Sequence, residues 1–150
     1  MLCRWQRRHA DELRGARVLE LGCGTGAVGL YAAALGARRV VLTDGGPDAL
    51  LELARANAAA ARDAALWRAG ETAVEVVRHG WGEPAAALGS HDLILGSDVT
   101  YADGAHAALC ASLAAQLQEH SPRARVVLAH EHRTVGARAT AGLALSLIHI

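Results

Sequence analysis

Short apolar segments alternate with longer segments of helical periodicity along most of the chain. Five of the short segments are rich in Val and Leu, as strands buried on both faces are. They cover residues 17–21, 39–43, 73–79, 91–98 and 124–130. Strands that alternate with helices usually form a parallel sheet with helices on both faces. The pattern therefore predicts an α/β fold.

The segments between the predicted strands carry the start and stop signals of helices. The first helix follows a run of glycines and ends near Gly36, which suits the left-handed residue after a helix. The second has Pro47 in its first turn, followed by apolar positions at helical spacing. The third is capped by Asp103 and ends before Pro122. A further helix, before Arg17, is expected to pack on the edge of the sheet.

The connections between the predicted strands determine their order in the sheet. Right-handed crossovers give a doubly wound parallel sheet of order 3-2-1-4-5. Ligands of such sheets bind in the crevice at the carboxyl ends of the strands, here the first and the fourth. Candidate functional residues are therefore expected at that edge.

The end of the sequence differs from the rest. Two of the three isoleucines lie in the final three positions, and "LSLIHI" is also what one frame of a common sequencing adapter encodes. We therefore expect a single domain over residues 1–144 and a tail foreign to the protein over residues 145–150. The segment 124–130 closes the readable strand pattern, so the sheet is expected to stop at its fifth strand.

Composition and charge limit the classes of protein that the chain can represent. A chain of 150 residues, 52% of them hydrophobic, fits one globular domain. Its 15 basic and 15 acidic residues give a net charge of zero, so nucleic acid is not expected as a partner. No apolar run reaches the roughly 18 residues of a membrane helix, so no membrane association is expected. A monomer is expected.

The three cysteines indicate the compartment. Cys3, Cys23 and Cys110 are odd in number and lack the spacing of a zinc site or of paired thiols. They fit free thiols in a reducing environment. A cytoplasmic protein is therefore expected, with the nucleus as the alternative.

The segment "VLELGCGTGAVGL" carries two overlapping glycine patterns. Gly24, Gly26 and Gly29 spell GxGxxG, which is typical of dinucleotide sites. The second pattern, ExGxGxG, begins at Glu20 and Gly22 and is typical of enzymes that bind S-adenosylmethionine (SAM). Glycines between a strand and a helix let the backbone approach a ligand and present N–H groups to it. Both nucleotides need this, so the glycines alone leave the cofactor open.

Two acidic residues at predicted strand ends add to the candidate site. Glu20 lies directly before the glycine loop, where a carboxylate can fix the loop and answer the ammonium of SAM, directly or through water. The alternative is a strand-end Glu that bonds only backbone. Asp44 ends the second strand, where an acid can bind the two ribose hydroxyls of either nucleotide. Its alternative role is that of a turn residue before Gly45.

The segment "GSDVTY" places Ser97, Asp98 and Tyr101 at the mouth of the same crevice. Methyl transfer needs an acceptor in line with the sulfonium methyl, and a carboxylate with an aromatic wall can seat a cationic amine. Asp98 and Tyr101 supply these two groups. A dehydrogenase would instead need a second domain for its substrate.

These segments, together with "VVLTDG" and "HGWGEP", resemble the seven-β-strand protein-lysine methyltransferases (methyltransferase family 16) from residue 2 to residue 132. The resemblance implies a class I SAM-dependent methyltransferase fold, which is Rossmann-like. It also implies that Gly22, Cys23 and Gly24 form the SAM loop, and that Asp44 binds the ribose. Trp81 would pack against the adenine, whereas without the resemblance it is most simply a core aromatic. Cys23 is interpreted as a small filler and not as a reactive thiol.

The resemblance also assigns roles around the transferred methyl. Ser97 would stand against the cofactor, and Asp98 and Tyr101 would form an acidic-x-x-aromatic motif near the methyl group. A Trp-bearing segment and the last two strands of the family are not found in the sequence, and Trp5 is not a substitute for that Trp. We therefore expect a fragment truncated at both ends.

Two histidines of the fifth predicted strand have the spacing of ligands on one strand face. With His130 and His132 but no third ligand in view, a polar strand end is the preferred interpretation, and no metal is expected.

The expected function is therefore methyl transfer from SAM to a lysine ε-amine of a protein substrate. Three alternatives stay open. They are a nucleic-acid or small-molecule N-methyltransferase, a SAM-binding scaffold without catalysis, and an NAD oxidoreductase, against which Glu20 counts.

Overall fold

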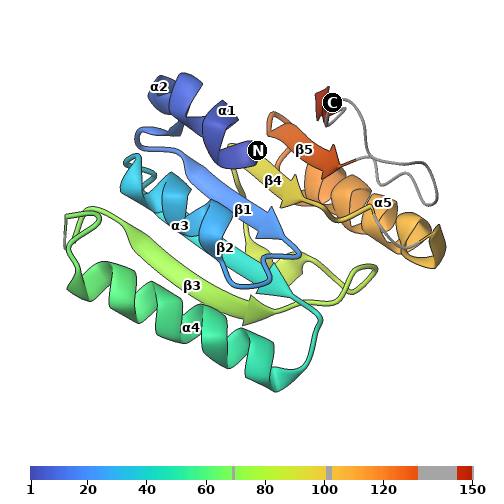
Figure 1. Cartoon of the computed structure of the whole chain (residues 1–150). Helices are drawn as coiled ribbons and strands as arrows, with labels where there is room; N and C mark the ends of the chain where they lie inside the picture. Colours follow the sequence, from blue (N-terminus) through green and yellow to red (C-terminus); the bar gives the residue numbers. More distant parts are fainter. Residues whose placement is uncertain (69, 101–102, 132–144, 150) are drawn as a thin grey trace, which may run out of the picture.

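The computed structural model describes residues 1–68, 70–100, 103–131 and 145–149, and a six-stranded sheet forms its centre (Figure 1). The strands lie in the order β3-β2-β1-β4-β5-β6. Their bounds are β1 Arg17–Leu21, β2 Arg39–Asp44, β3 Ala73–Arg78, β4 Leu93–Ser97, β5 Arg125–Glu131 and β6 Leu145–His149. The first five are mutually parallel, so the predicted order 3-2-1-4-5 is confirmed.

The prediction that the sheet ends with its fifth strand is wrong, because a sixth strand pairs with β5. β6 pairs antiparallel with β5, from Val127 opposite His149 to Glu131 opposite Leu145. The backbone of an edge strand offers free N–H and C=O groups to any extended segment, whatever its side chains. Composition therefore did not reveal this pairing, and the foreign origin of residues 145–150 stays a prediction.

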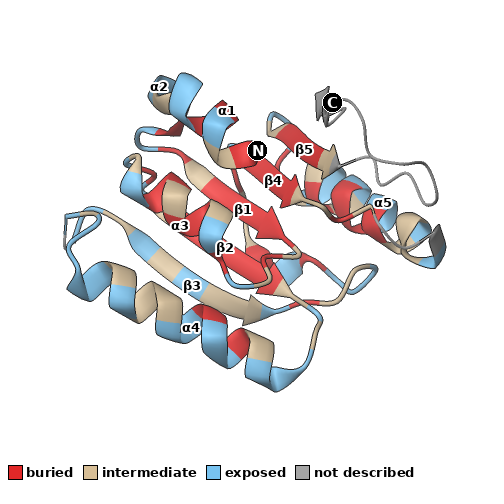
Figure 2. Cartoon of the chain, viewed as in Figure 1, coloured by how far each residue is buried: buried red, intermediate tan, exposed pale blue. Residues whose placement is uncertain are grey.

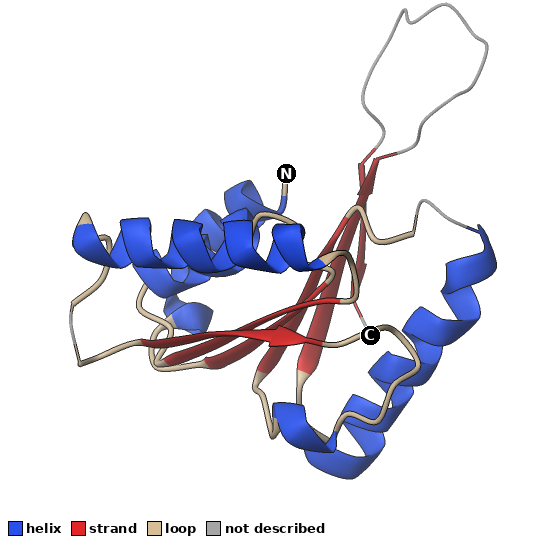
Figure 3. Ribbon diagram, turned by 90° about the horizontal axis from the view of Figure 1, so that it is seen from below, coloured by secondary structure: helices blue, strands red, loops and turns tan. Residues whose placement is uncertain are grey.

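Helices cover both faces of the sheet (Figure 3). They are α1 Leu2–Arg8, α2 Ala10–Leu13, α3 Ala27–Ala34, α4 Asp48–Asp63 and α5 His106–Ala115. The single helix expected before Arg17 is broken at His9 into α1 and α2. α5 begins after a 3₁₀ turn over Asp103–Ala105, with Ala105 as its N-cap and not Asp103, and it continues as a π-helical turn over Gln116–His120.

Alternation along the strands divides the core into two apolar clusters. On β1, Val18 packs in a cluster with residues of α1 and α3, whereas Leu19 and Leu21 pack in a cluster with residues of α5. β1, β2 and β4 are buried almost throughout, while β3 lies at the edge and is partly exposed (Figure 2). The loops that follow β1 and β2 therefore start from strands that are fixed by burial on both faces. No helix in the described part of the chain is long and apolar enough to cross a membrane.

Candidate functional site

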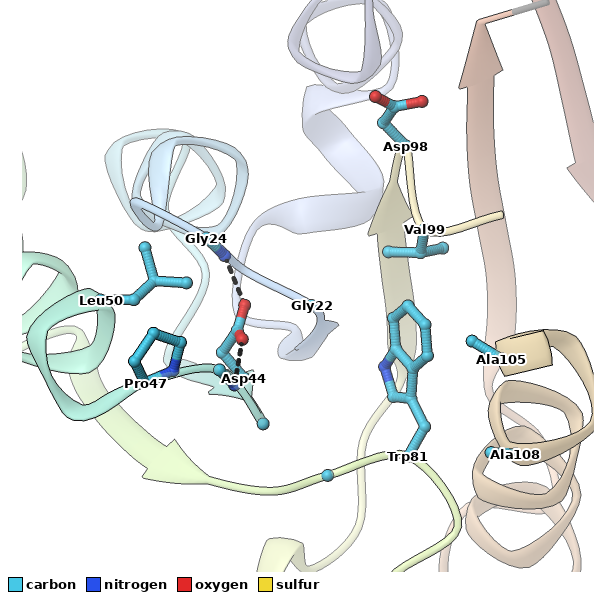
Figure 4. Close-up of a pocket in the computed structure, with 13 residues that line it drawn as sticks. Gly22, Gly24, Asp44, Pro47, Leu50, Trp81, Asp98, Val99, Ala105 and Ala108 are labelled. Atoms are coloured by element: carbon cyan, nitrogen blue, oxygen red, sulfur yellow. Dashed lines mark hydrogen bonds between the residues drawn. The ribbon is translucent and has the colours of Figure 1, made fainter. Parts of the chain in front are cut away.

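A cavity of about 600 Å³ opens at the carboxyl ends of β1, β2 and β4 (Figure 4). Gly22, Gly24, Asp44, Trp81 and Asp98, all predicted from the sequence, line it. The other lining residues are Gly45, Gly46, Pro47, Leu50, Gly80, Val99, Ala105 and Ala108. The cavity is therefore at the edge of the sheet where the strand order predicted it.

Asp44 joins two of the loops that form this cavity. Its Oδ2 accepts a hydrogen bond from the backbone N of Gly24 at 2.9 Å, and its Oδ1 accepts one from the backbone N of Gly46 at 2.8 Å (Figure 4). A carboxylate oxygen can accept more than one hydrogen bond. Asp44 can therefore hold both loops and still accept hydroxyl groups of a ligand.

The loop after β1 has a backbone that only glycine adopts readily. Gly22 has a φ of +69° and Gly24 a φ of +54°. A Cβ at Gly22 would also lie 2.9 Å from Cγ1 of Val99 and 3.1 Å from Cζ2 of Trp81. Glycine is thus required at this position both by φ and by the close approach of the cavity wall.

Cys23 belongs to this loop but does not line the cavity. Its backbone N donates to the carbonyl of Thr43 at 2.8 Å, and its side chain is buried in the apolar cluster of α1 and α3. Burial raises the pKa of the thiol to about 12, so it stays protonated at neutral pH. The structure supports its interpretation as a small filler.

Glu20 lies behind the loop, away from the lining of the cavity. Its side chain is 1% exposed, and its Oε2 accepts a hydrogen bond from the backbone N of Gly29 at 2.8 Å. Burial, only partly offset by this bond, raises the pKa of the carboxyl to about 8. Its contact is thus the backbone bond of the alternative interpretation, which fixes α3 to β1. Contact with a ligand ammonium stays a prediction.

Trp81 forms an apolar wall of the cavity. Its indole is half-buried and stands between the glycine loop and α5, with Val99 next to it (Figure 4). On the side of α5, the lining residues Ala105 and Ala108 are small. An aromatic face beside small side chains leaves room for a flat ring to stack.

Asp98 lies at the mouth of the cavity, directly after β4 (Figure 4). Its φ of +56° is a left-handed conformation, which Asp adopts more readily than most residues. Its backbone N donates to the carbonyl of Ala129 at 2.8 Å, and its Oδ1 is 4.0 Å from Nδ1 of His130. Such a backbone outlier at a ligand site often aims a functional side chain.

Of the two remaining predicted site residues, Ser97 and Tyr101, the structure describes only Ser97. Ser97 ends β4 and is half-buried, but it does not line the cavity. Tyr101 lies outside the described residues, and so does His132. In the part of the chain that the structure describes, no three His, Cys, Asp or Glu side chains come together as metal ligands would.

Several lining residues were missed by the sequence analysis. Gly45 carried a signal, because it follows Asp44 directly, and a Cβ there would lie 2.8 Å from Cα of Gly80. The loops after β2 and β3 thus touch through two glycines. Ala105 and Ala108 carried none, since alanines recur throughout the sequence.

Comparisons with known proteins agree with this geometry. A family model described as lysine methyltransferase matches residues 2–140. Protein N-lysine methyltransferase METTL21A from Danio rerio is 38% identical over 115 residues, which are 75% of this chain and 50% of that protein. The Mus musculus protein of the same name is 39% identical over 94 residues, which are 61% of this chain and 40% of that protein. The chain thus spans about half of the length of these curated relatives, or less.

Solved structures share the fold. Magnesium protoporphyrin IX methyltransferase from Synechocystis, determined with bound SAH, matches with a TM-score of 0.63 at 22% identity, over 90% of this chain and 55% of that one. An S-adenosylmethionine dependent methyltransferase from Mesorhizobium loti matches with a TM-score of 0.57 at 25% identity, over 87% of this chain and 54% of that one. The predicted order of the first five strands is thus that of a known architecture.

Proposed function

Because the chain belongs to the lysine methyltransferase family and has the class I methyltransferase fold, we propose that it transfers a methyl group from SAM to a lysine ε-amine of a protein. The observation that carries the proposal is the cavity in which Asp44, Trp81 and Asp98 lie around one glycine loop. The relatives named as protein N-lysine methyltransferases support the protein substrate.

The residues of the cavity fit SAM as the cofactor. Asp44 keeps acceptor capacity for the two ribose hydroxyls after bonding Gly24 and Gly46. Trp81 offers its indole to the adenine, opposite the small side chains of α5. A Cβ at Gly24 would meet no protein atom within 4 Å, so the loop leaves its backbone open to a ligand there.

The reaction demands alignment more than strong acid-base groups. SAM supplies a methyl group on a sulfonium, which is already an electrophile. A lysine amine is a nucleophile only without its proton, so the site must receive it neutral or release its proton to water. Asp98, at the mouth of the cavity, attracts the charged amine and orients it, while its left-handed backbone fixes the direction of its carboxylate. Tyr101 is proposed as the aromatic partner of Asp98.

We also propose the oligomeric state and the location of the protein. A cytoplasmic location fits the free thiols of Cys3, Cys23 and Cys110, among which the structure forms no disulfide. A monomeric state is proposed with it. The net charge of zero gives no support to nucleic acid as the substrate.

Calorimetry with SAM and with NAD tests the cofactor. The protein is expected to bind SAM, and Asp44→Asn to bind it at least about tenfold more weakly, because an amide N–H would face a backbone N–H of one loop. Asp63→Asn, at an exposed position at the end of α4, is the matched control and should bind normally. Binding of NAD without binding of SAM would contradict the proposal.

Transfer of labelled methyl groups tests the substrate. The protein is incubated with labelled SAM and a cell lysate, and labelled residues are located by mass spectrometry. We expect label on lysine side chains, reduced about a hundredfold by Asp98→Asn because the variant loses the charge that seats the amine. Label confined to RNA would move the function to a nucleic-acid methyltransferase, and SAM binding without transfer to a scaffold.

A further inference from the structure

Trp81 stands on a short turn that is held at both of its ends. The backbone N of Gly80 donates to Oε2 of Glu83 at 2.8 Å, and the backbone N of Glu83 donates to the carbonyl of Gly80 at 3.1 Å. The backbone N of Gly82 donates to Oγ of Ser112 at 2.8 Å. Glu83 belongs to the turn itself, whereas Ser112 comes from α5, so Ser112 ties the turn to another element.

Ser112 is buried where its hydroxyl can both accept one hydrogen bond and donate another. Its side chain is on the inner face of α5, and the residue is 2% exposed. Nε2 of His79 lies 3.5 Å from its Oγ, and His79 is 3% exposed. Burial lowers the pKa of His79, so the neutral imidazole can accept from the hydroxyl while the hydroxyl accepts from Gly82.

The turn fits between two surfaces that leave it little freedom. On one side a Cβ at Gly45 would lie 2.8 Å from Cα of Gly80, so the turn meets the loop after β2. On the other side a Cβ at Gly82 would lie 3.6 Å from Cβ of Ala108 on α5. The contact of Ser112 with Gly82 therefore ties the residue next to Trp81 to α5. On that side of the cavity the indole of Trp81 stands beside Ala105 and Ala108 (Figure 4).

We propose that Ser112 is a positioning residue, which holds the Trp81 turn against α5 so that the indole closes the base-binding part of the cavity. The identification of that base as the adenine of SAM rests on the proposed function. Without the hydroxyl, the N–H of Gly82 loses its acceptor in a partly buried place, and the turn shifts to regain one. The indole moves with it.

The first test is a double-mutant cycle read by the dissociation constant of SAM. Ser112→Ala is expected to bind SAM about tenfold more weakly, with Ser112→Thr close to the unchanged protein because it keeps the hydroxyl. Cys110→Ala, at an exposed position of the same helix, is the matched control. In a Trp81→Ala background, Ser112→Ala should cause no further loss, because Ser112 acts through Trp81. Equal losses in both backgrounds, or none in either, would overturn the proposal.

The second test needs no ligand. Hydrogen exchange at the amide of Gly82 is expected to be slow in the unchanged protein and in Ser112→Thr, and faster in Ser112→Ala. Unchanged exchange in Ser112→Ala would show that the contact does not hold the turn. If Ser112→Ala does not fold, Ser112→Cys takes its place, since a thiol is only a weak acceptor. If neither the unchanged protein nor any of these variants binds SAM, the proposed function is refuted. Hydrogen exchange at the amide of Gly82 would then still decide whether Ser112 holds the turn.

Discussion

Two carboxylates at neighbouring strand ends show how far environment decides a residue's role. Asp44 lines the cavity and accepts from the backbone of two loops. Glu20, one strand away, is closed off from solvent and accepts from the backbone of Gly29. The pKa of Glu20 is raised to about 8 by burial. At neutral pH it therefore acts mainly as a protonated structural group, and Asp44 as the carboxylate nearest to a ligand.

The raised pKa of Glu20 predicts a pH dependence of stability. From its ordinary pKa of 4.5 up to about 8, the unfolded chain loses the proton of this carboxyl while the folded protein keeps it. The folded state then binds more protons, so the free energy of unfolding falls as the pH rises through this range. Glu20→Gln keeps an oxygen for the N–H of Gly29 but does not titrate, so its fall should be smaller.

Urea unfolding at pH 5, 6.5 and 8 measures this effect, with Glu52→Gln on the exposed face of α4 as the control. The free energy of unfolding of Glu52→Gln should fall with pH in parallel with that of the unchanged protein. For Glu20→Gln it should approach the value of the unchanged protein at pH 5 and exceed it at pH 8. A Glu20→Gln protein that loses as much stability as the unchanged one would show that Glu20 is ionised in the fold.

At the scale of elements, α3 lies close to the sheet because one of its residues has no side chain. Gly29 is buried in this helix, and its N–H donates to the side-chain carboxyl of Glu20. A Cβ at Gly29 would collide with Cδ2 of Leu42 and lie 3.1 Å from Cγ1 of Val40 and 2.8 Å from Oε2 of Glu20. The last glycine of GxGxxG thus serves the packing of helix on strand, while the earlier ones form the loop.

Gly29→Ala is therefore expected to destabilise the fold by about 1–3 kcal/mol, because the added methyl overpacks the space between α3 and β2. The helical preference of Ala offsets only a part of this, about 0.5–1 kcal/mol. Denaturant unfolding measures the change. Gly104→Ala is the control, since a Cβ there has open space, and it should leave the stability nearly unchanged. Equal stability of the two variants would refute the packing argument.

At the scale of the whole molecule, the site depends on the central strands and not on the β6 edge. Within the described part of the chain, the residues that line the cavity lie between Gly22 and Ala108 in the sequence. β6 contributes a strand at the far edge, next to β5. Binding and edge stability should therefore respond separately to changes at the end of the chain.

Removal of residues 145–150 tests this separation. The shortened protein should bind SAM within about twofold of the unchanged affinity, because the lining residues that the structure describes all remain. Its melting temperature should fall by a few degrees, since the backbone groups of β5 lose their partners in β6. Calorimetry and thermal unfolding give the two values. A loss of SAM affinity without a change in melting temperature would contradict the prediction.

Local patterns in the sequence were enough to predict the strands β1 to β5, their order, and the part of the site that follows them directly. Apolar runs and glycines act locally, because a buried strand needs consecutive apolar residues and a tight loop needs positions without a Cβ. Gly22, Gly24, Asp44 and Asp98 could therefore be placed at one edge of the sheet from these patterns, whereas Trp81 was placed there only by the family resemblance.

The directions of the side chains and the contacts between distant segments depend instead on how the elements pack together. Glu20 follows the same sequence logic as Asp44, yet packing against α3 encloses it. The bond between Ser112 and Gly82 joins residues 30 positions apart. β6 pairs through backbone groups that leave no mark on composition. These contacts arise from how helices and strands pack, and no local pattern in the sequence encodes that packing.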